Sequence, residues 1–437
     1  QETVVWYDAF LRPYRVRTRP VSGGGATTHV KTTYDGLGRT IFISQPSASA
    51  DPTAGMVRTY DALGRELTAT DNITNGVTTT AYLSNGQTRV TDPKGDITTT
   101  TSRFYGDPGR PEVTQIDQPL GLVSTFTYDT YANLTSLNQS GTHSGFTSNV
   151  TRSFWYDARN RLCRHRAPEL GDELFAYDAL DRLIQKASGL AAATTCDAPP
   201  AAERTETTFD TMGRPITINF PGTTPDIAKT YDNNGNVTSV NRSGVNWTYQ
   251  YNNIDALTLE RLQLDGRTYE FTYGYTPEGF LTTASMPFAG SVSFAPNGLG
   301  QPTGLTIGGN TIASLGTYFP NGAPQAMSFG NGYAYSAVQN ARQLVTSAQT
   351  VSGSVNAINR TYAYDAVLPR LTGITDNAVS GENRAFTYDA LGRLSTASGP
   401  WGAGSYTYDL LGNLRSWTQG SSTHTTCLLY TSDAADE

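Results

Sequence analysis

The sequence predicts an all-β protein, built as repeated antiparallel β-hairpins that form one continuous curled sheet, a spiral or part of a hollow shell. A Tyr-Asp turn motif recurs along nearly the whole chain of 437 residues. The segments between these turns alternate in polarity, as strands do. In addition, no window of about ten residues combines helical apolar spacing with helix caps.

The expected strands are short runs rich in Thr, Tyr, Val and Phe. The segments AFTYDA at Ala385–Ala390 and RTYAYD at Arg360–Asp365 are examples. Gly, Asn, Asp and Pro bound such runs, which is the pattern of strands joined by tight turns. The chain therefore reads as strand, turn and strand throughout.

The Tyr-Asp motif is the main repeated unit, with Phe in place of Tyr once. Many copies continue into Gly-Arg or Gly-Asn, as in YDALGR, which occurs at Tyr60–Arg65 and again at Tyr388–Arg393. The predicted repeat residues are Tyr7, Asp8, Tyr34, Asp35, Gly38, Arg39, Tyr60, Asp61, Gly64, Arg65, Tyr128, Asp129, Tyr156, Asp157, Tyr177, Asp178, Phe209, Asp210, Gly213, Arg214, Tyr231, Asp232, Gly235, Tyr364, Asp365, Tyr388, Asp389, Gly392, Arg393, Tyr408, Asp409 and Gly412.

Looser copies fill the gaps between these motifs. They begin at Tyr82, Tyr105, Tyr251, Tyr275, Phe294 and Tyr318. Counting them, the motif recurs mostly every 20–25 residues or so, which is typical of a repeat protein.

Each residue of the motif has an expected part in a hairpin turn. Asp is expected to accept hydrogen bonds from turn amides, and Gly to supply a positive φ. The aromatic ring ends one strand, and Arg, Leu or Val begins the next. We expect rings of successive hairpins to stack as a ladder, and an exposed Asp–Arg pair to contribute only ~0–1 kcal/mol.

The number of hairpins predicts a hollow object. About eighteen hairpins give about thirty-six strands, and at ~4.8 Å per strand the sheet is roughly 170 Å wide. Open twisted sheets rarely exceed ~10 strands without curling or splitting. A single closed turn of that width would be ~55 Å across, too wide for side chains to fill.

Composition limits the partners. The formal charge of -7 makes nucleic acid an unfavoured partner, and we interpret the basic run Arg12–Pro20 as a solvated strand face. No stretch is apolar enough for a membrane span. We expect one repeat domain at 1–426, incomplete at both ends, followed at 427–437 by a tail that resembles translated sequencing adapter.

Two regions depart from the average repeat. Between Gly279 and Asn359 the only charged side chain is Arg342. Because such a surface is poorly solvated, we expect part of it to line the lumen or to meet sequence outside this chain. The segment Ser188–Glu203 is the best candidate for a long loop that leaves the wall without marking a domain boundary.

No residue pattern predicts catalysis, a metal site or a cofactor. A glycosidase needs one special carboxylate pair, whereas these Asp residues recur at one position of a period. Cys163, beside Arg164 and His165, could form a reactive thiolate, but a packed or exposed strand position is favoured. Cys163 and Cys196 could form a disulfide, although two cysteines make no framework and free thiols are favoured.

The motifs YDALGRELTATD, YDALGRLSTASG, YDNNGNVTSVNRSG and FGNGYAYSA resemble RHS/YD repeats. Such repeats occur in bacterial RHS polymorphic toxins, in the cocoon component of insecticidal toxin complexes and in teneurins. The resemblance implies hairpins wound into a hollow shell. Family members with a cargo carry a DPxG-rich, self-cleaving core and a variable toxin domain, which are not found here. TDPKG at Thr91–Gly95 lies among early repeats, so no protease role is assigned to Asp92.

The resemblance implies a non-enzymatic shell segment that encapsulates or presents a C-terminal effector absent from this chain. The expected partners are the core and effector of the same polypeptide, and either delivery machinery or a cell-surface glycan. A secreted or cell-surface bacterial location is expected. The alternative is a cell-surface adhesion or carbohydrate-binding module, in which exposed Tyr and Trp rings would stack on sugars.

Overall fold

The computed structural model describes residues 1–20, 25–105, 111–191, 196–288 and 290–425. These residues form a single sheet of 37 antiparallel strands and one short 3-10 turn, η1, at Pro119–Gly121. The all-β, hairpin-repeat prediction is confirmed. The expected tail at 427–437 and part of the copy at Tyr105 lie outside the described residues.

The strands follow one another around the sheet in chain order. The first nineteen are β1 (Glu2–Tyr7), β2 (Pro13–Arg19), β3 (Thr28–Tyr34), β4 (Thr40–Ser44), β5 (Gly55–Tyr60), β6 (Glu66–Asp71), β7 (Gly76–Tyr82), β8 (Gln87–Thr91), β9 (Ile97–Arg103), β10 (Glu112–Asp117), β11 (Val123–Tyr128), β12 (Leu134–His143), β13 (Phe146–Tyr156), β14 (Leu162–Ala167), β15 (Gly171–Tyr177), β16 (Leu183–Leu190), β17 (Arg204–Phe209), β18 (Pro215–Asn219) and β19 (Ile227–Tyr231).

The remaining strands continue the same meander. They are β20 (Val237–Arg242), β21 (Val245–Tyr251), β22 (Leu257–Leu264), β23 (Arg267–Tyr275), β24 (Leu281–Met286), β25 (Gly290–Ser293), β26 (Gly304–Ile307), β27 (Asn310–Tyr318), β28 (Pro324–Phe329), β29 (Ala334–Gln339), β30 (Val345–Ser352), β31 (Val355–Tyr364), β32 (Leu371–Asp376), β33 (Arg384–Tyr388), β34 (Leu394–Gly399), β35 (Gly402–Tyr408), β36 (Leu414–Gln419) and β37 (Ser422–Thr425).

The Tyr-Asp hairpins share one turn geometry. In the copy at Tyr60, the amide of Asp61 donates to the carbonyl of Arg65, and the amide of Gly64 donates to the carbonyl of Asp61. Gly64 has φ 81°, so this is a three-residue loop whose last residue is left-handed. The strand register shifts between Thr59 and Tyr60, and this bulge increases the local twist.

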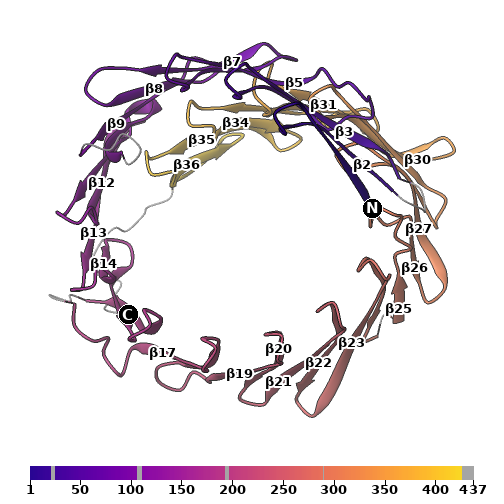
Figure 1. The fold of residues 1–437 in the computed structure, drawn as a ribbon. Helices are drawn as coiled ribbons and strands as arrows, with labels where there is room; N and C mark the ends of the chain where they lie inside the picture. The colour runs from indigo at the N-terminus through magenta and orange to yellow at the C-terminus, as the bar shows by residue number, and fades with distance from the viewer. Residues whose placement is uncertain (21–24, 106–110, 192–195, 289, 426–437) are drawn as a thin grey trace.

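The sheet coils around a central axis and does not close. Figure 1 shows β27 to β36, in orange to yellow, lying beside the early strands β2 to β13 in indigo to magenta. Contacts between these coils join Asp71 to Arg342 and Lys94 to Asp365, pairs whose positions both differ by 271. The turn after β8 thus contacts the turn after β31, so one coil contains about 23 strands. At ~4.8 Å per strand along its circumference, the coil has a diameter of roughly 35 Å.

The wall is a single layer with little buried core. The chain exposes 24506 Å², whereas a compact monomer of 47.0 kDa would expose about 16,000 Å². The buried apolar cluster is small and consists of Leu174, Ala187 and Leu190. Side chains reach only about 5 Å from a sheet, so a coil of this width encloses a lumen. The coil is hollow, as the number of strands predicted, but its diameter is smaller than that of one closed turn containing all the strands.

The left-handed turn position generates the first prediction. Ala132 occupies it with φ 64° and Gly64 with φ 81°. A side chain there costs about 1–2 kcal/mol, partly offset because glycine has more freedom when unfolded. A Cβ on Gly64 would approach no atom closer than 3.9 Å. A change in stability on substitution would therefore come from the backbone conformation and not from a steric clash.

We expect Ala132→Gly to raise the free energy of unfolding by about 0.5–1 kcal/mol, and Gly64→Ala to lower it by about 1 kcal/mol. Urea denaturation of the two variants measures both changes. Shifts of the same sign would contradict the proposed conformational cause.

Candidate functional site: the repeated turn and the seam between coils

The aspartate of each repeat is fully engaged in its own turn. Asp61 Oδ1 accepts hydrogen bonds from the amides of Leu63 and Arg65, both at 2.9 Å, and its Oδ2 accepts one from Arg65 Nε at 2.7 Å. The same three bonds form at Asp8, Asp35, Asp157, Asp178, Asp210 and Asp389.

These bonds favour the ionised form of Asp61. The Arg65 amide, together with its guanidinium and the Leu63 amide, holds the pKa of Asp61 below its ordinary value, against the opposing effect of burial. Where Asn replaces Arg, as at Asn133, Asn236 and Asn413, its Nδ2 donates to the same aspartate Oδ2. The carboxylate is a turn acceptor in both versions.

The arginine also connects its turn to the next one, which the sequence did not predict. Arg39 Cζ lies 4.9 Å from the ring centre of Tyr60, and its Nη1 donates to the carbonyl of Asp61 at 2.9 Å. The guanidinium-to-ring distance is 4.0 to 4.9 Å at Arg12, Arg39, Arg65, Arg161, Arg182, Arg214 and Arg393. An exposed contact of this kind contributes about 0.5–1 kcal/mol.

The tyrosine hydroxyl reaches back to the preceding hairpin. Tyr60 Oη donates to the carbonyl of Thr40, the residue after Arg39, at 2.6 Å. Equivalent bonds of 2.7 to 3.1 Å form from Tyr34, Tyr82, Tyr156, Tyr177, Tyr231, Tyr251, Tyr275, Tyr364 and Tyr388. We call the Asp–Arg pair, the next ring and this hydroxyl bond the latch.

The expected ladder of stacked rings is not what joins the hairpins. The stacked pairs among the described residues involve other rings, such as Trp247 with Tyr249 at 6.3 Å. A guanidinium occupies the place between repeats instead. Phe209, which has no hydroxyl, still lies 4.6 Å from Arg182 Cζ, which explains why Phe can replace Tyr at this position.

The residues considered for chemistry have structural partners. Asp92 accepts hydrogen bonds from the amides of Lys94 and Asp96 in a turn. His165 stacks on Phe154 at 4.8 Å, and its Nδ1 lies 3.0 Å from Glu173 Oε2. Across residues 1–20, 25–105, 111–191, 196–288 and 290–425, no cluster of His, Cys, Asp and Glu could hold a metal ion, and no helix has the length and apolarity of a membrane span.

The cysteines are bonded, contrary to the favoured prediction of free thiols. Cys163 and Cys196 form a disulfide across 33 residues, with Cα atoms 5.3 Å apart. Cys163 is buried, so it offers no reactive thiolate. The bond ties the segment after β16 back to β14. The predicted loop is also shorter than expected, because Ser188 to Leu190 remain in β16.

A buried ion cluster beside this disulfide was not predicted. Asp172 is fully buried and lies 3.2 Å from Arg164 Nη2 and 2.7 Å from Arg166 Nε. Arg164 also stacks on Trp155 at 4.0 Å. The neighbouring Glu173 has its pKa lowered to about 2, because Lys186, His165 and Ser188 outweigh the opposing effect of burial. The charges are paired, as buried charges must be.

The two edges of the wall carry different turns. We call the edge with the Tyr-Asp turns the tyrosine rim, and the other edge the glycine rim, which includes the turns Asp71–Gly76, Thr91–Ile97 and His143–Phe146. The described contacts between coils join the glycine rim of the first coil to the tyrosine rim of the second. Lys94 pairs with Asp365, and Gln343 Nε2 donates to the carbonyl of Pro46 at 2.6 Å. We call this junction the seam.

Arg342, the lone charge of the segment Gly279–Asn359, is a seam residue. Its guanidinium donates to the carbonyls of Asp365 at 3.3 Å and Val367 at 3.1 Å, and its Nε lies 3.4 Å from Asp71 Oδ2 on the first coil. Part of the charge-poor segment therefore meets the first coil of the same chain. The expectation that part of this segment lines the lumen or meets sequence outside this chain stays a prediction.

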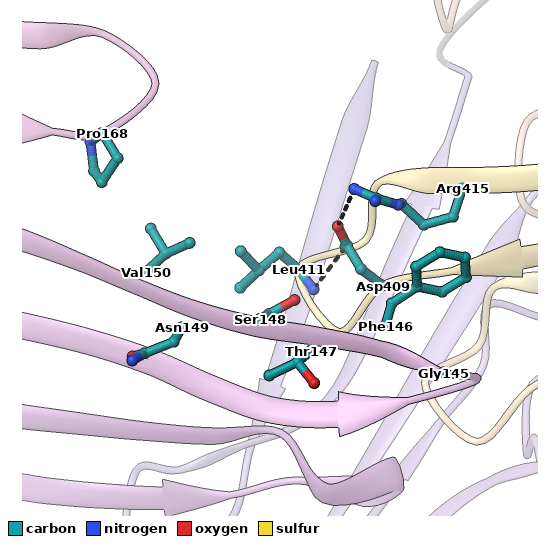
Figure 2. A pocket seen from close by; sticks show the side chains of 10 residues that line it. All are labelled: Gly145, Phe146, Thr147, Ser148, Asn149, Val150, Pro168, Asp409, Leu411 and Arg415. Carbon is teal, nitrogen blue, oxygen red and sulfur yellow. Dashed lines mark hydrogen bonds and ion pairs between the residues drawn. The ribbon is translucent and has the colours of Figure 1, made fainter. Parts of the chain in front are cut away.

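One cavity beside a repeat motif lies in the seam. It has a volume of about 460 Å³ between the tip of β13 and the turn at Asp409. Figure 2 shows Arg415 directed toward Asp409, with the Phe146 ring beside it; Arg415 Cζ is 4.8 Å from that ring and its Nη1 is 3.8 Å from Asp409 Oδ2. Asp409 also accepts from the Leu411 amide at 3.0 Å. The cavity thus lies between two coils, and its acid is a turn residue.

Comparisons with known proteins support the fold. No family model and no curated protein matches the sequence. Among solved structures, the Photorhabdus luminescens Tc holotoxin pore matches with a TM-score of 0.71 and 16% identity over 95% of this chain. TcdB2-TccC3 without its hypervariable C-terminal region matches with a TM-score of 0.73 and 15% identity over 96%. TcdB2-TccC3-TEV gives 0.63 and 17% over 96%.

This chain spans about a quarter of each of those solved chains. At these identities the matches show a shared fold. They confirm the fold that the RHS/YD resemblance implied, over nearly the whole chain.

The seam pair Lys94–Asp365 generates a pH prediction. Burial disfavours the Asp365 carboxylate, but Lys94 and the amides of Val367 and Leu368 outweigh it and lower its pKa from 3.8 to about 2. A lowered pKa stabilises the fold above the ordinary value, and that contribution is lost as the pH falls through about 2.

We expect the wild type to lose up to about 2 kcal/mol more stability than Asp365→Asn between about pH 5 and about pH 2.5. Asn fits this turn, since it already occupies the position at Asn252, Asn297 and Asn340. Lys94→Met should remove part of the same pH dependence, because the amides of Val367 and Leu368 still bind the carboxylate. Equal losses in the wild type and both variants, measured by urea denaturation, would exclude this role of the pair.

Proposed function

We propose that this chain, which has the fold of part of TcdB2-TccC3, is a segment of a shell wall that encloses a polypeptide cargo. The observation that carries the proposal is the hollow, latched coil of more than one turn. A wall of hairpins buries little of its own surface, so its structure is suited to surrounding a volume rather than to forming a core. The charged side chains of its repeat motif form ion pairs and hydrogen bonds within the wall.

The matched structures support the choice of cargo. TccC3 has a hypervariable C-terminal region, and TcdB2-TccC3 was also solved as TEV and Cdc42 versions. A constant wall combined with a variable C-terminal segment is what containment requires. By this analogy the cargo of the present wall is the C-terminal effector of the same polypeptide, in a secreted or cell-surface bacterial protein.

The adhesion alternative has less support from the geometry. Sugar binding by stacking needs an accessible ring face, and the rings of Tyr60, Tyr82, Tyr177 and Tyr231 carry a guanidinium at 4.0 to 4.9 Å. We therefore expect no binding above background when the chain is applied to a glycan array. Strong binding would favour the alternative.

Containment is tested with an unstructured, trypsin-sensitive reporter of about 60 residues joined after Thr425. We expect its cleavage to be about tenfold slower than that of the free reporter, because the wall restricts access of the protease. The double variant Lys94→Met with Arg342→Met breaks two seam contacts and should restore much of the cleavage rate. Equal cleavage of the joined and the free reporter would count against containment.

A further inference from the structure

The segment Cys196–Glu203, which we call the strap, joins the disulfide to the start of β17. Its first residue is bonded to Cys163 on β14, and β17 begins directly after its last residue, at Arg204. β14 and β17 are three strand positions apart, which is roughly 14 Å at ~4.8 Å per strand. The eight residues of the strap reach about 27 Å when extended, so they can pass over β15 and β16.

The pairing of the strands shows which face of the wall the strap covers. Leu174 of β15 pairs with Arg164 of β14 and with Ala187 of β16. Ala187 in turn pairs with Arg204. Directly opposite residues point to the same face of a sheet, so these side chains form one row. Arg204 Nη1 donates to the carbonyl of Pro199 in the strap at 3.2 Å. The strap therefore lies over the face that carries this row.

The face under the strap is buried, although the wall is a single layer. Leu174 and Ala187 are 3% and 1% exposed, and Asp172, two residues before Leu174 on the same strand, is fully buried. A sheet face is removed from water when another element packs on it. Pro199 is itself almost completely buried, so the strap and this part of the wall bury each other.

The strap has a covalent anchor, the disulfide, and a non-covalent one, the bond from Arg204 to Pro199. Without the covalent anchor, opposing effects act on the closed strap. Burial of apolar side chains such as Leu174 favours closure. Opening, in contrast, returns water to Asp172 and Arg164, whose charges lose solvation when they are buried. Because these effects oppose each other, the disulfide determines whether the strap stays closed.

The two halves of the disulfide differ in access. Cys163 is 4% exposed, whereas Cys196 is exposed. We propose that the Cys163–Cys196 bond is a redox switch, and that its reduction by a dithiol releases the strap and loosens β14 to β17. The inference goes beyond containment, because the switch acts on the wall itself, with or without a cargo.

The reduction transfers two electrons from the dithiol to the disulfide. One thiolate of the dithiol attacks Cys196 Sγ, and the electron pair of the S–S bond leaves with Cys163 Sγ, which takes up a proton. The second thiolate of the dithiol then attacks the mixed disulfide and displaces Cys196 Sγ, which is protonated in turn. Both protons come from the thiols of the reductant. The products are two cysteine thiols and the oxidised dithiol.

The test is amide hydrogen exchange, followed by mass spectrometry, before and after treatment with dithiothreitol. All samples carry Cys427→Ser, so that a thiol count on the unfolded protein reports only on Cys163 and Cys196. We expect no free thiol before treatment and two after it. Peptides from β15 and β16 should then exchange at least about tenfold faster, because a cross-link over 33 residues restricts the opened states. Peptides from β5 and β6 should be unchanged.

Two variants separate the switch from a general effect of the reductant. Cys196→Ser should exchange in β15 and β16 like the reduced wild type, whether or not dithiothreitol is present. Ala198→Ser is the matched control, because it places the same side chain at an exposed strap position and keeps both anchors, so it should behave like the wild type. Two free thiols before treatment, or unchanged exchange in β15 and β16 after reduction, would overturn the proposal and leave containment untouched.

Discussion

The guanidinium of the repeats that carry Arg after the turn is the contact on which the wall depends. In a turn such as the one at Asp35, Arg39 closes its own hairpin through the carboxylate and then covers the ring of Tyr60 in the next hairpin. An isolated hairpin is barely stable. Because the same side chain serves two turns, each hairpin is stabilised by its neighbour, which is how repeat proteins gain stability.

The coil and its seam follow from repeating this contact. Each bulged hairpin adds twist, and the sheet therefore bends until its second coil meets the first. The seam residues Arg342 and Asp365 lie in turns on the same edge of the sheet as the latches. One kind of turn thus serves two purposes, latching along the sheet and contact between coils.

The local part of this structure could be predicted from the sequence and the long-range part could not. The hydrogen bonds of Asp61 span at most four residues, so the residues of the motif determine the turn geometry by themselves. The ring contact joins one repeat to the next, and the sequence predicted ring stacking there instead of the guanidinium contact. The seam joins positions 271 apart, and that offset depends on accumulated twist, which no local pattern encodes. The Cys163–Cys196 bond and the buried Asp172 depend in the same way on how β14 to β16 pack.

The most direct test of the latch is a double-mutant cycle between Arg39→Met and Tyr60→Leu, followed by urea denaturation. A shared contact predicts a coupling of about 0.5–1 kcal/mol, because the loss in the double variant would be smaller than the sum of the single losses. The pair Arg39 and Tyr82, which are one hairpin further apart, should show no coupling. Additive losses for Arg39 with Tyr60 would contradict the claim that the guanidinium joins successive hairpins.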